Sequence, residues 1–289
     1  MSRTLQRSSP VNSSRVPPVT AANRAAVSFV LKPVPAAVAV ALLALHGQGL
    51  RDVAAAPTGA QVTAGAATIR QSGTQTVINQ STPRAALNWQ SFGIAAGEAV
   101  IFRQPSSAAV ALNRVVGPDP SAIFGTLQAN GHVFLINPNG VLFGRGANVD
   151  VAGLVASTLN LSNNDFMAGR YVFSGGSGTG SVIIHGTLRA ANGGYVALLG
   201  NQVSNTGTIT AANGTVALGA GESMVLDFHG DGLLSLKVNA TAARARIDHS
   251  GEIHAEGGAV IMSAAAKSAL LDTVLNVARH RAGARCVDA

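Results

Sequence analysis

The sequence contains little cysteine, few aromatic residues and few charged residues. One cysteine in 289 residues excludes a disulfide scaffold and a zinc site built on several cysteines. Aromatic residues make up 4% and charged residues 11% of the chain, whereas an ordinary soluble domain is roughly 25% charged. Hydrophobic residues nevertheless reach 47%, which excludes an intrinsically disordered chain. The composition is therefore that of a folded protein built from small, uncharged side chains.

The net charge of +7 is carried by the two ends of the chain. Residues 1–51 contain six basic side chains and no acidic one, and residues 267–289 contain four basic and two acidic ones. Residues 52–266, in contrast, are nearly neutral, with ten basic and eleven acidic side chains. A nucleic-acid-binding protein gathers basic residues on one face with aromatic residues among them. We therefore predict no nucleic-acid partner.

The first 56 residues have the pattern of a secretory signal peptide. A basic region precedes an uncharged run at 34–45, and small residues at 53–56 supply a cleavage site. The run is shorter than the roughly 20 residues that span a bilayer, and the alternative is a buried core helix. We predict a signal peptide with a long basic n-region at 1–56, a main domain at 57–266 and a truncated or irregular tail at 267–289. The inner-membrane export machinery is then a partner, through the signal peptide.

The main domain repeats one pattern four times. Each copy begins with glycine, alternates apolar and polar residues, turns at Asn-Gly or Gly-Gly and alternates again; the copies begin at Gly125, Gly186, Gly207 and Gly251. Alternation with a period of two indicates strands rather than helices. The spacings of 61, 21 and 44 residues are close to three, one and two multiples of a unit of about 21 residues. A weaker copy at 146–156 fills part of the first gap.

Repetition at a fixed period predicts a β-solenoid rather than a set of separate hairpins. Equivalent Val, Ile and Leu residues of successive units would stack in parallel and fill a narrow core, which explains the scarcity of aromatic residues. We expect an all-β parallel β-helix with N-terminal cap strands at 57–105 and an inserted β-hairpin at 222–249. Caps are expected because open strand edges promote aggregation.

The sequence contains no recognised catalytic or cofactor-binding motif. It has no nucleophile elbow, no Walker loop and no zinc-protease motif. Two groups of titratable residues are candidates for acid-base chemistry or metal binding: Asp227 with Asp231, and the set His249, Glu252, His254 and Glu256. Turn formation and a solvated strand face are the simpler interpretations of these groups. We predict no enzymatic activity, no metal and no cofactor.

The most distinctive short segment is Asn137-Pro138-Asn139-Gly140, which lies between the apolar runs 133–136 and 141–143. Asn-Pro and Asn-Gly pairs both favour tight turns. Asparagine side chains in such turns bond to nearby backbone groups. The segment therefore predicts a corner between two strands, with its amide side chains capping the backbone.

Longer blocks carry a resemblance to a known family. Residues 134–144 contain the Asn-Pro-Asn-Gly element, and Val-Ala-Gly-Leu-Val-Ala-Ser follows at 151–157. Further blocks occur in order at 84–92, 97–105, 111–115 and 166–171. From about residue 58 to 275 the chain resembles the haemagglutination-activity domain, which is the N-terminal secretion domain of filamentous-haemagglutinin-like exoproteins in two-partner secretion.

The resemblance implies a right-handed parallel β-helix with a non-enzymatic role in secretion. An outer-membrane transporter with POTRA domains would recognise the unfolded chain in the periplasm, and the protein would be secreted or reach the cell surface. The residues that match the family's motifs are Asn137, Pro138, Asn139 and Gly140 and, in an upstream block, Asn79 and Asn88. These residues either bind the transporter or shape the fold, and the sequence leaves both roles open.

Two other functions stand as alternatives. A surface adhesin would bind host glycans or proteins through its exposed strand faces. A β-helix polysaccharide lyase would need charged residues clustered on one sheet, whereas the acids of the main domain are spread thinly. Because family members continue into long repeats, the loss of the pattern after residue 276 predicts a truncated gene or a stand-alone secretion module.

Overall fold

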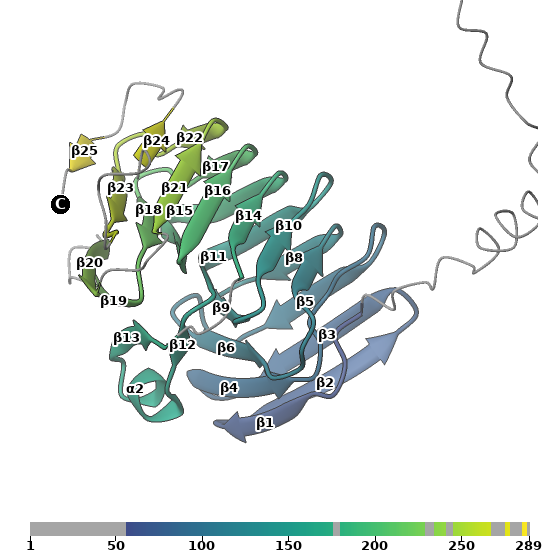
Figure 1. The fold of residues 1–289 in the computed structure, drawn as a ribbon. Coiled ribbons are helices and arrows are strands. Elements are labelled where there is room, and N and C mark those ends of the chain that lie inside the picture. Colours follow the sequence, from purple (N-terminus) through teal and green to yellow (C-terminus); the bar gives the residue numbers. More distant parts are fainter. Residues whose placement is uncertain are drawn as a thin grey trace, which may run out of the picture. The chain divides into compact units, whose positions relative to one another are not determined.

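The structure is a computed structural model whose described residues form many strands and one short helix (Figure 1). It describes residues 56–175, 180–228, 234–240, 245–266, 275–277 and 285–287. The predicted signal peptide lies outside the described residues except for Ala56. No helix in the described part of the chain is long and apolar enough to cross a membrane.

Most strands form a three-sided coil in which each side is a ladder of parallel strands. The first ladder contains β3 (Gln75–Gln80), β5 (Ala99–Arg103), β8 (Thr126–Ala129), β11 (Asn148–Ser157), β15 (Thr187–Gly200), β17 (Thr208–Thr210) and β22 (Glu252–His254). The second contains β4 (Arg84–Trp89), β6 (Val110–Val115), β9 (His132–Ile136), the later halves of β11 and β15, β18 (Thr215–Ala220), β23 (Ala259–Ala264) and β25 (Arg285–Val287).

The third ladder contains β7 (Ser121–Ile123), β10 (Val141–Phe143), β14 (Val182–Ile184), β16 (Gln202–Asn205), β21 (Arg246–His249) and β24 (Leu275–Val277). The fold is the right-handed parallel β-helix expected from the sequence, and right-handed connection between parallel strands follows from strand twist. The range 267–289, predicted as an irregular tail, contains β24 and β25, and both extend the parallel ladders.

The antiparallel cap is shorter than the range 57–105 predicted for it. Among the described strands at this end, β1 (Gln61–Ala64) pairs antiparallel with β4 and β2 (Ala67–Ser72) with β3, and an isolated antiparallel bridge joins Thr58 to Ser91. The strands β3, β4 and β5, which lie in the same range, already belong to the parallel ladders. The cap therefore closes the first coil with two strands.

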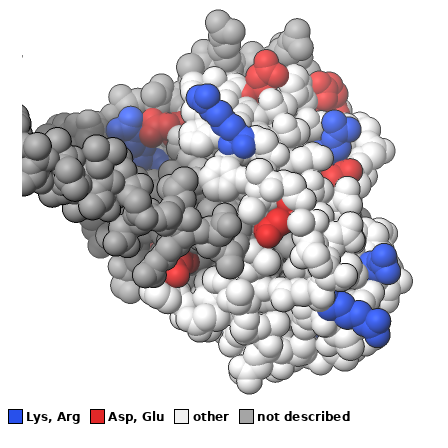
Figure 2. All heavy atoms as spheres, turned by 90° about the vertical axis from the view of Figure 1, so that its right-hand side faces the viewer, with Lys and Arg blue, Asp and Glu red and all other residues white. Residues whose placement is uncertain are grey.

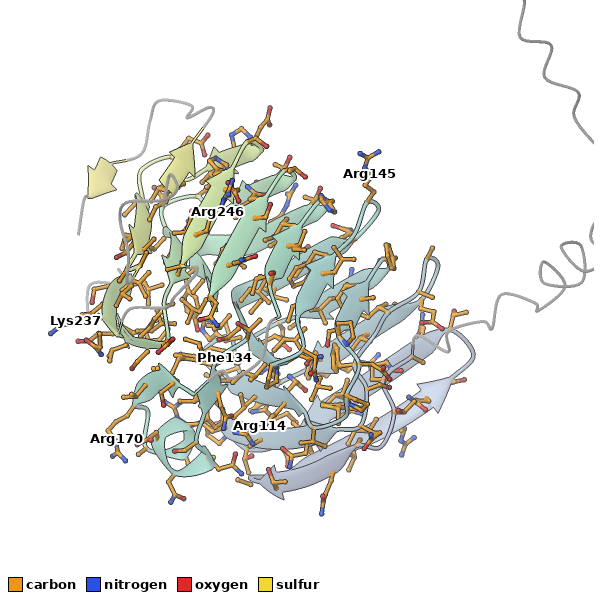
Figure 3. All side chains as sticks on the ribbon, viewed as in Figure 1. Arg114, Phe134, Arg145, Arg170, Lys237 and Arg246 are labelled. Atoms are coloured by element: carbon orange, nitrogen blue, oxygen red, sulfur yellow. The ribbon has the colours of Figure 1, made fainter. Side chains whose placement is uncertain are left out.

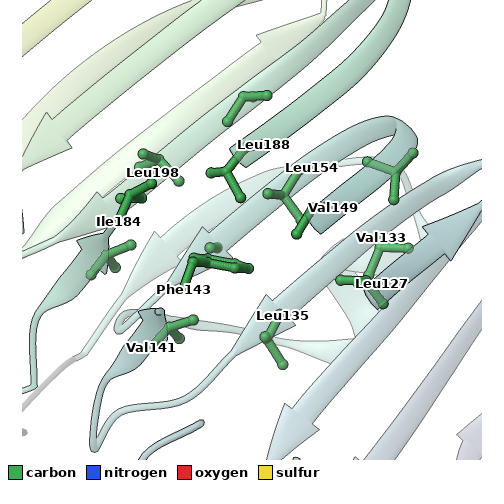
Figure 4. Packing of buried hydrophobic residues seen from close by; sticks show 14 of the residues in the cluster. Leu127, Val133, Leu135, Val141, Phe143, Val149, Leu154, Ile184, Leu188 and Leu198 are labelled. Carbon is green, nitrogen blue, oxygen red and sulfur yellow. The ribbon is translucent and has the colours of Figure 1, made fainter. Parts of the chain in front are cut away.

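The interior of the coil is filled by aliphatic side chains from all three ladders. Leu127, Val149 and Leu188 stack from the first ladder, and each is fully buried. Figure 4 shows the labelled side chains of the cluster converging in the space between the strands. Each buried Val, Leu or Ile stabilises the fold by about 1.5–3 kcal/mol. Small residues suffice because the tube is narrow, as the low aromatic content indicated.

The number of turns differs from the one inferred from the glycine spacings. The residues Thr126, Asn148, Thr187, Thr208 and Glu252 are successive partners in the first ladder. The gap from Gly125 to Gly186 therefore contains two turns rather than three, and the gap from Gly207 to Gly251 contains one rather than two. The additional residues leave the coil and form a separate sheet.

That separate sheet is antiparallel and lies against the outside of the second ladder. It contains β12 (Asn160–Leu161), β13 (Tyr171–Ser174), β19 (Ser223–Phe228) and β20 (Leu234–Ala240), and the helix α2 (Asn163–Met167) connects β12 to β13. The antiparallel pair β19–β20 is the predicted inserted hairpin. The hairpin is thus one half of a four-stranded sheet.

A second hydrophobic core fills the space between this sheet and the coil. Phe134 on β9 points outward from the coil and packs on Tyr171 and Phe173, with ring centroids 5.3 and 6.4 Å apart. Figure 3 shows Phe134 within this packed region. The second ladder is therefore buried on both faces, which accounts for the unbroken apolar run of β9.

His132 lies at the edge of this second core with its imidazole stacked on Tyr195. The ring centroids are 5.0 Å apart and the planes differ by 10°. Gly153 lies between the two strands, and a Cβ there would stand 2.3 Å from His132 Nδ1. Burial lowers the pKa of His132 to about 4, and its Nδ1 has no hydrogen-bond partner in the described part of the chain.

The buried imidazole predicts that acid destabilises the fold. The unfolded chain binds a proton at His132 near pH 6.5, whereas the folded chain does so only near pH 4. The contribution of neutral His132 to the free energy of unfolding is therefore at its maximum above pH 6.5. It decreases by up to about 3 kcal/mol between pH 6.5 and pH 4. Urea unfolding of the wild type and of His132→Phe at pH 7.5 and pH 4.5 measures the loss of stability that His132 causes at low pH. An equal loss at low pH in both proteins would assign the effect to other groups.

Candidate functional site

The segment Asn137–Gly140 forms the corner that connects β9 to β10. The Asn137 side-chain Oδ1 accepts a hydrogen bond from the Asn139 backbone N–H at 2.9 Å. The Gly140 N–H in turn donates to the Asn137 carbonyl at 3.0 Å. Gly140 has a φ of 122°, which an L side chain rarely adopts. The corner is thus the tight, amide-capped turn predicted from the sequence.

The corner is also bonded to the preceding turn of the coil. The Asn137 Nδ2 group donates to the Asp119 carbonyl and to Ser121 Oγ, both at 3.0 Å. The Asn139 Nδ2 group donates to the Gly117 carbonyl at 2.9 Å. Both amide side chains therefore hold consecutive turns together.

On its other side the corner touches the next turn. The Val141 N–H donates to the Ser181 carbonyl at 3.0 Å. A Cβ on Gly180 would stand 2.5 Å from the Gly140 nitrogen. The corner thus contacts both neighbouring turns.

The four residues of the corner differ in exposure. Asn137 is completely buried and Gly140 is buried, whereas Pro138 is half-buried and Asn139 is exposed. In the folded protein, the solvent-facing part of the corner therefore consists mainly of Asn139 and one side of Pro138. The Asn137 amide is inaccessible once the coil has formed.

The upstream residues Asn79 and Asn88 lie on other ladders. Asn79 is on the outward face of β3, opposite Arg103 of β5 in the sheet register. Asn88 is on the outward face of β4, where its Oδ1 accepts a hydrogen bond from Arg114 Nη1 at 3.2 Å. The sequence-predicted residues therefore do not form one cluster in the folded state.

Arg114 is a structural residue that the sequence patterns did not single out. Its Nε donates to Asn160 Oδ1 and its Nη1 to Asn163 Oδ1, both at 2.9 Å, and its Nη2 bonds to the Leu161 carbonyl. Burial lowers the pKa of the guanidinium. Figure 3 shows Arg114 between the coil and the separate sheet. Arg114 thus fastens β12 and α2 to the coil, and Asn88 takes part in this clamp.

A second group missed from sequence is a set of buried amides. Gln104 Nε2 donates to Gln80 Oε1 at 3.0 Å, and Gln80 Nε2 donates to the Val110 carbonyl at 3.2 Å. Asn113 Oδ1 accepts from Trp89 Nε1 at 3.0 Å. Most buried amide groups in proteins are hydrogen-bonded; among these side chains, Gln104 Oε1 has no partner in the described part of the chain. These residues fix the first turns of the coil near the cap.

The titratable groups considered from sequence do not converge on a catalytic or metal centre. His249 is inside the coil and bonds to Asn205, whereas Glu252 and Glu256 lie outside, 3.2 and 3.6 Å from His254. No group of three or more His, Cys, Asp or Glu among the described residues is arranged to hold a metal. Asp227 lies on β19 and Asp231 lies outside the described residues.

The charged side chains are dispersed as the composition suggested. Figure 2 shows basic and acidic side chains separated by uncharged residues on the face in view. Arg145 extends from the loop after β10, and Arg170 from the segment between α2 and β13 (Figure 3). The face in view therefore lacks the continuous basic surface of a nucleic-acid-binding protein.

A comparison with known protein families identifies the family of this chain. A model of the TPS secretion domain, the secretion domain of two-partner secretion, matches residues 53–287. The chain belongs to the TPS secretion-domain family. The match to the family model therefore confirms the resemblance that the Asn-Pro-Asn-Gly block and its flanking segments indicated for this TPS domain.

Relatives of this TPS domain include much longer proteins. A heme/hemopexin-binding protein of Haemophilus influenzae is 35% identical over 208 residues, which are 69% of this chain and 23% of that protein. A second Haemophilus influenzae protein of the same name is 44% identical over 97 residues, 34% of this chain and 10% of that protein. The chain thus spans less than a quarter of the length of these curated relatives.

Two solved structures share the fold. The HMW1 secretion domain from Haemophilus influenzae has a TM-score of 0.68 and 31% identity, and the match covers 71% of this chain and 55% of that one. The filamentous hemagglutinin secretion domain has a TM-score of 0.53 and 20% identity, covering 77% and 80% respectively, and supports the fold alone. The assignment to a haemagglutinin-type secretion domain is confirmed.

Proposed function

We propose that this TPS domain is recognised in the periplasm, while still unfolded, by a cognate outer-membrane transporter with POTRA domains, and folds outside the cell. The main support is the buried position of Asn137, whose amide is fully bonded inside the coil. A transporter has access to this amide only before the coil forms. Asn79, Asn88, Pro138, Asn139 and Gly140 complete the proposed recognition set.

The energetics of a coil support folding after passage. A single turn cannot bury its own apolar face, so each turn gains most of its stability from its neighbours. The cap strands β1 and β2 give the first turn a partner as soon as they have emerged. Each added turn then buries several aliphatic side chains at about 1.5–3 kcal/mol each. The folded part resists return through the transporter, and no enzymatic step is required.

The signal segment and the fold both support one export route for the protein. We propose export across the inner membrane through the signal peptide at 1–56, transfer to the transporter and release to the medium or the cell surface. The body described by the structure contains no cysteine before residue 286, so no disulfide forms within residues 57–266 during passage through the oxidising periplasm. This keeps the main domain free of covalent loops while it is threaded.

Replacing Asn139 with alanine tests recognition separately from folding. The variant loses one exposed hydrogen bond, to the Gly117 carbonyl, and keeps the buried bonds of Asn137. We expect secretion through the co-expressed cognate transporter to fall roughly tenfold, equivalent to about 1.4 kcal/mol of recognition free energy. The measurement is the ratio of extracellular to periplasmic protein. Its matched control is Asn148→Ala, an exposed asparagine on β11 outside the proposed set.

The two asparagine variants give opposite outcomes if the proposal holds. Asn148→Ala should be secreted like the wild type, and purified Asn139→Ala should refold from urea with nearly the wild-type midpoint. Wild-type secretion of both Asn139→Ala and Asn137→Ala would remove the corner from the recognition set. A loss of secretion matched by a large loss of stability in Asn139→Ala would assign it to folding instead.

A further inference from the structure

The outward face of the first ladder carries two adjoining hollows near the cap. One, of about 450 Å³, is lined by Arg70 of β2, Asn79 of β3 and Arg103 of β5, among others. The other, of about 570 Å³, is lined by Arg103, Gln128 of β8 and Asp150 of β11, among others. Arg103 belongs to both. We call the surface formed by Arg70, Asn79, Arg103, Gln128 and Asp150 the outer groove.

The polar side chains of the outer groove are not used by the fold. Within the described part of the chain, Arg70, Asn79, Arg103 and Gln128 make no side-chain hydrogen bond or ion pair. The amide nitrogens of Gln80, Gln104 and Asn137 are, in contrast, all hydrogen-bonded. Donors and acceptors of the groove therefore remain available to a ligand. Two of them are guanidinium groups, which bind carboxylates in a bidentate manner.

The backbone in the middle of the groove is closed to an added peptide strand. The strands β3, β5 and β8 are each paired on both sides, whereas β2, at the rim of the groove, pairs with β3 alone. Recognition over β3, β5 and β8 must therefore use side chains. Two pairs of these side chains, Asn79 with Arg103 and Gln128 with Asp150, are register neighbours on adjacent strands about 4.8 Å apart, which is close to the length of one pyranose unit.

The floor of the groove suits a sugar ring as well. Val77 and Ile101 are register neighbours on the outward face, and both are half-buried between the polar residues. A sugar ring presents C–H groups on its faces and hydroxyl groups at its rim. Gln128 and Asp150 are positioned for the hydroxyl groups, while Arg70 and Arg103 meet an acidic group.

We infer that the outer groove binds an acidic polysaccharide, with a carboxylate between Arg70 and Arg103 and hydroxyl groups at Gln128 and Asp150. Asn79 belongs both to the outer groove and to the proposed recognition set, whereas Arg70 and Arg103 belong to the groove alone, so variants of the two arginines test this binding activity separately from secretion. It gives the adhesin alternative a defined site on this domain.

Titration of the purified secreted chain with polygalacturonate at physiological salt tests the inference. We expect the double variant Arg70→Gln/Arg103→Gln to bind roughly tenfold more weakly, as expected for the loss of charge-assisted hydrogen bonds. Arg145→Gln is the control, since Arg145 is exposed on the loop after β10 and does not line either hollow. Circular dichroism and the urea midpoint check that all variants are folded, and secretion of the double variant should equal that of the wild type.

Two further probes separate the ligand classes. Dextran, a neutral polysaccharide, and poly-glutamate, an acidic peptide, should both bind more weakly than polygalacturonate. Absence of polygalacturonate binding, or equal binding by the double variant and Arg145→Gln, would overturn the inference. Equal or tighter binding of poly-glutamate through the same arginines would also overturn it, and would assign the groove to the carboxylates of a protein. None of these outcomes depends on recognition by the transporter.

Discussion

Replacement of Asn137 with alanine is expected to lower the free energy of unfolding by about 4 kcal/mol, because roughly 1–3 kcal/mol is lost for each buried polar group left without a partner. Three groups lose their partner: the Asp119 carbonyl, Ser121 Oγ and the Asn139 N–H. Asn137 and Ser121 are both fully buried, so water cannot replace the amide at Ser121 Oγ without entering the coil, whereas the bonds to the Asp119 carbonyl and the Asn139 N–H are part-buried. Urea unfolding followed by circular dichroism measures the change.

The neighbouring Asn139 provides the comparison. Its side chain is exposed and makes one bond between turns, to the Gly117 carbonyl. Water can take the place of that bond, so Asn139→Ala should lose only about 1 kcal/mol. The ratio between the two losses is the diagnostic quantity. Equal losses would show that the exposed half of the corner supports the fold as much as the buried half does.

The coil itself was predictable because its stabilising residues repeat in sequence. Leu188, Ile209 and Ile253 occupy the same position of three repeats, and the structure stacks them as register partners. Period-two alternation then fixed which residues point inward. The corner at Asn137–Gly140 was predictable for a similar reason, since its turn chemistry is local.

The number of turns was not predictable from the glycine spacings. The excursions that build the separate sheet are nearly as long as one turn of the coil, so a spacing of 44 residues imitates two repeats. The second core was missed for a related reason. Outward residues such as Phe134 and Leu199 are buried by strands that come from two distant segments of the chain, 160–174 and 223–240.

The sites away from the corner depend on partners that are distant in sequence. Arg114 bonds to Asn160 and Asn163, 46 and 49 residues further along the chain. No local pattern marks that contact. Asn79 and Gln80 show the effect of strand parity: one faces the outer groove and the other is buried among amides. His249 and Glu252 are close in sequence, which suggested that they could act together. A corner between β21 and β22 instead places His249 inside the coil and Glu252 outside it.

A column of glycines sets how closely successive turns approach. Gly194, Gly214 and Gly258 lie at the same corner of three consecutive turns. A Cβ on Gly214 would stand 1.9 Å from the Gly194 carbonyl oxygen, and a Cβ on Gly258 would stand 1.9 Å from the Gly214 carbonyl oxygen. The obstructing atoms belong to the backbone and cannot rotate away. The turns must therefore separate to admit any side chain.

Gly214→Ala should accordingly destabilise the protein by about 3 kcal/mol or more, the upper range for an overpacked interior. Separation at this corner also strains the hydrogen bond from the Ala259 N–H to the Gly214 carbonyl, which is 2.8 Å long. We expect a lower urea midpoint and faster amide hydrogen exchange in β18 and β23, which adjoin the corner. If amide hydrogen exchange in β18 and β23 of this variant is as slow as in the wild type, the explanation by close backbone contact between turns is wrong.

Gly193→Asn is the control, because it adds a larger side chain one residue from Gly194 at a place with open space. No atom lies within 4 Å of a Cβ on Gly193, and its φ of 74° is one that asparagine tolerates. If backbone contact between turns decides the outcome, the small alanine at 214 is far more damaging than the larger asparagine at 193. If the two variants are equally unstable, the instability comes from the local backbone conformation that glycine allows at the corner. The close approach of successive turns is then not its cause. If the domain folds turn by turn as proposed above, a coil whose turns cannot close would gain less free energy from each added turn.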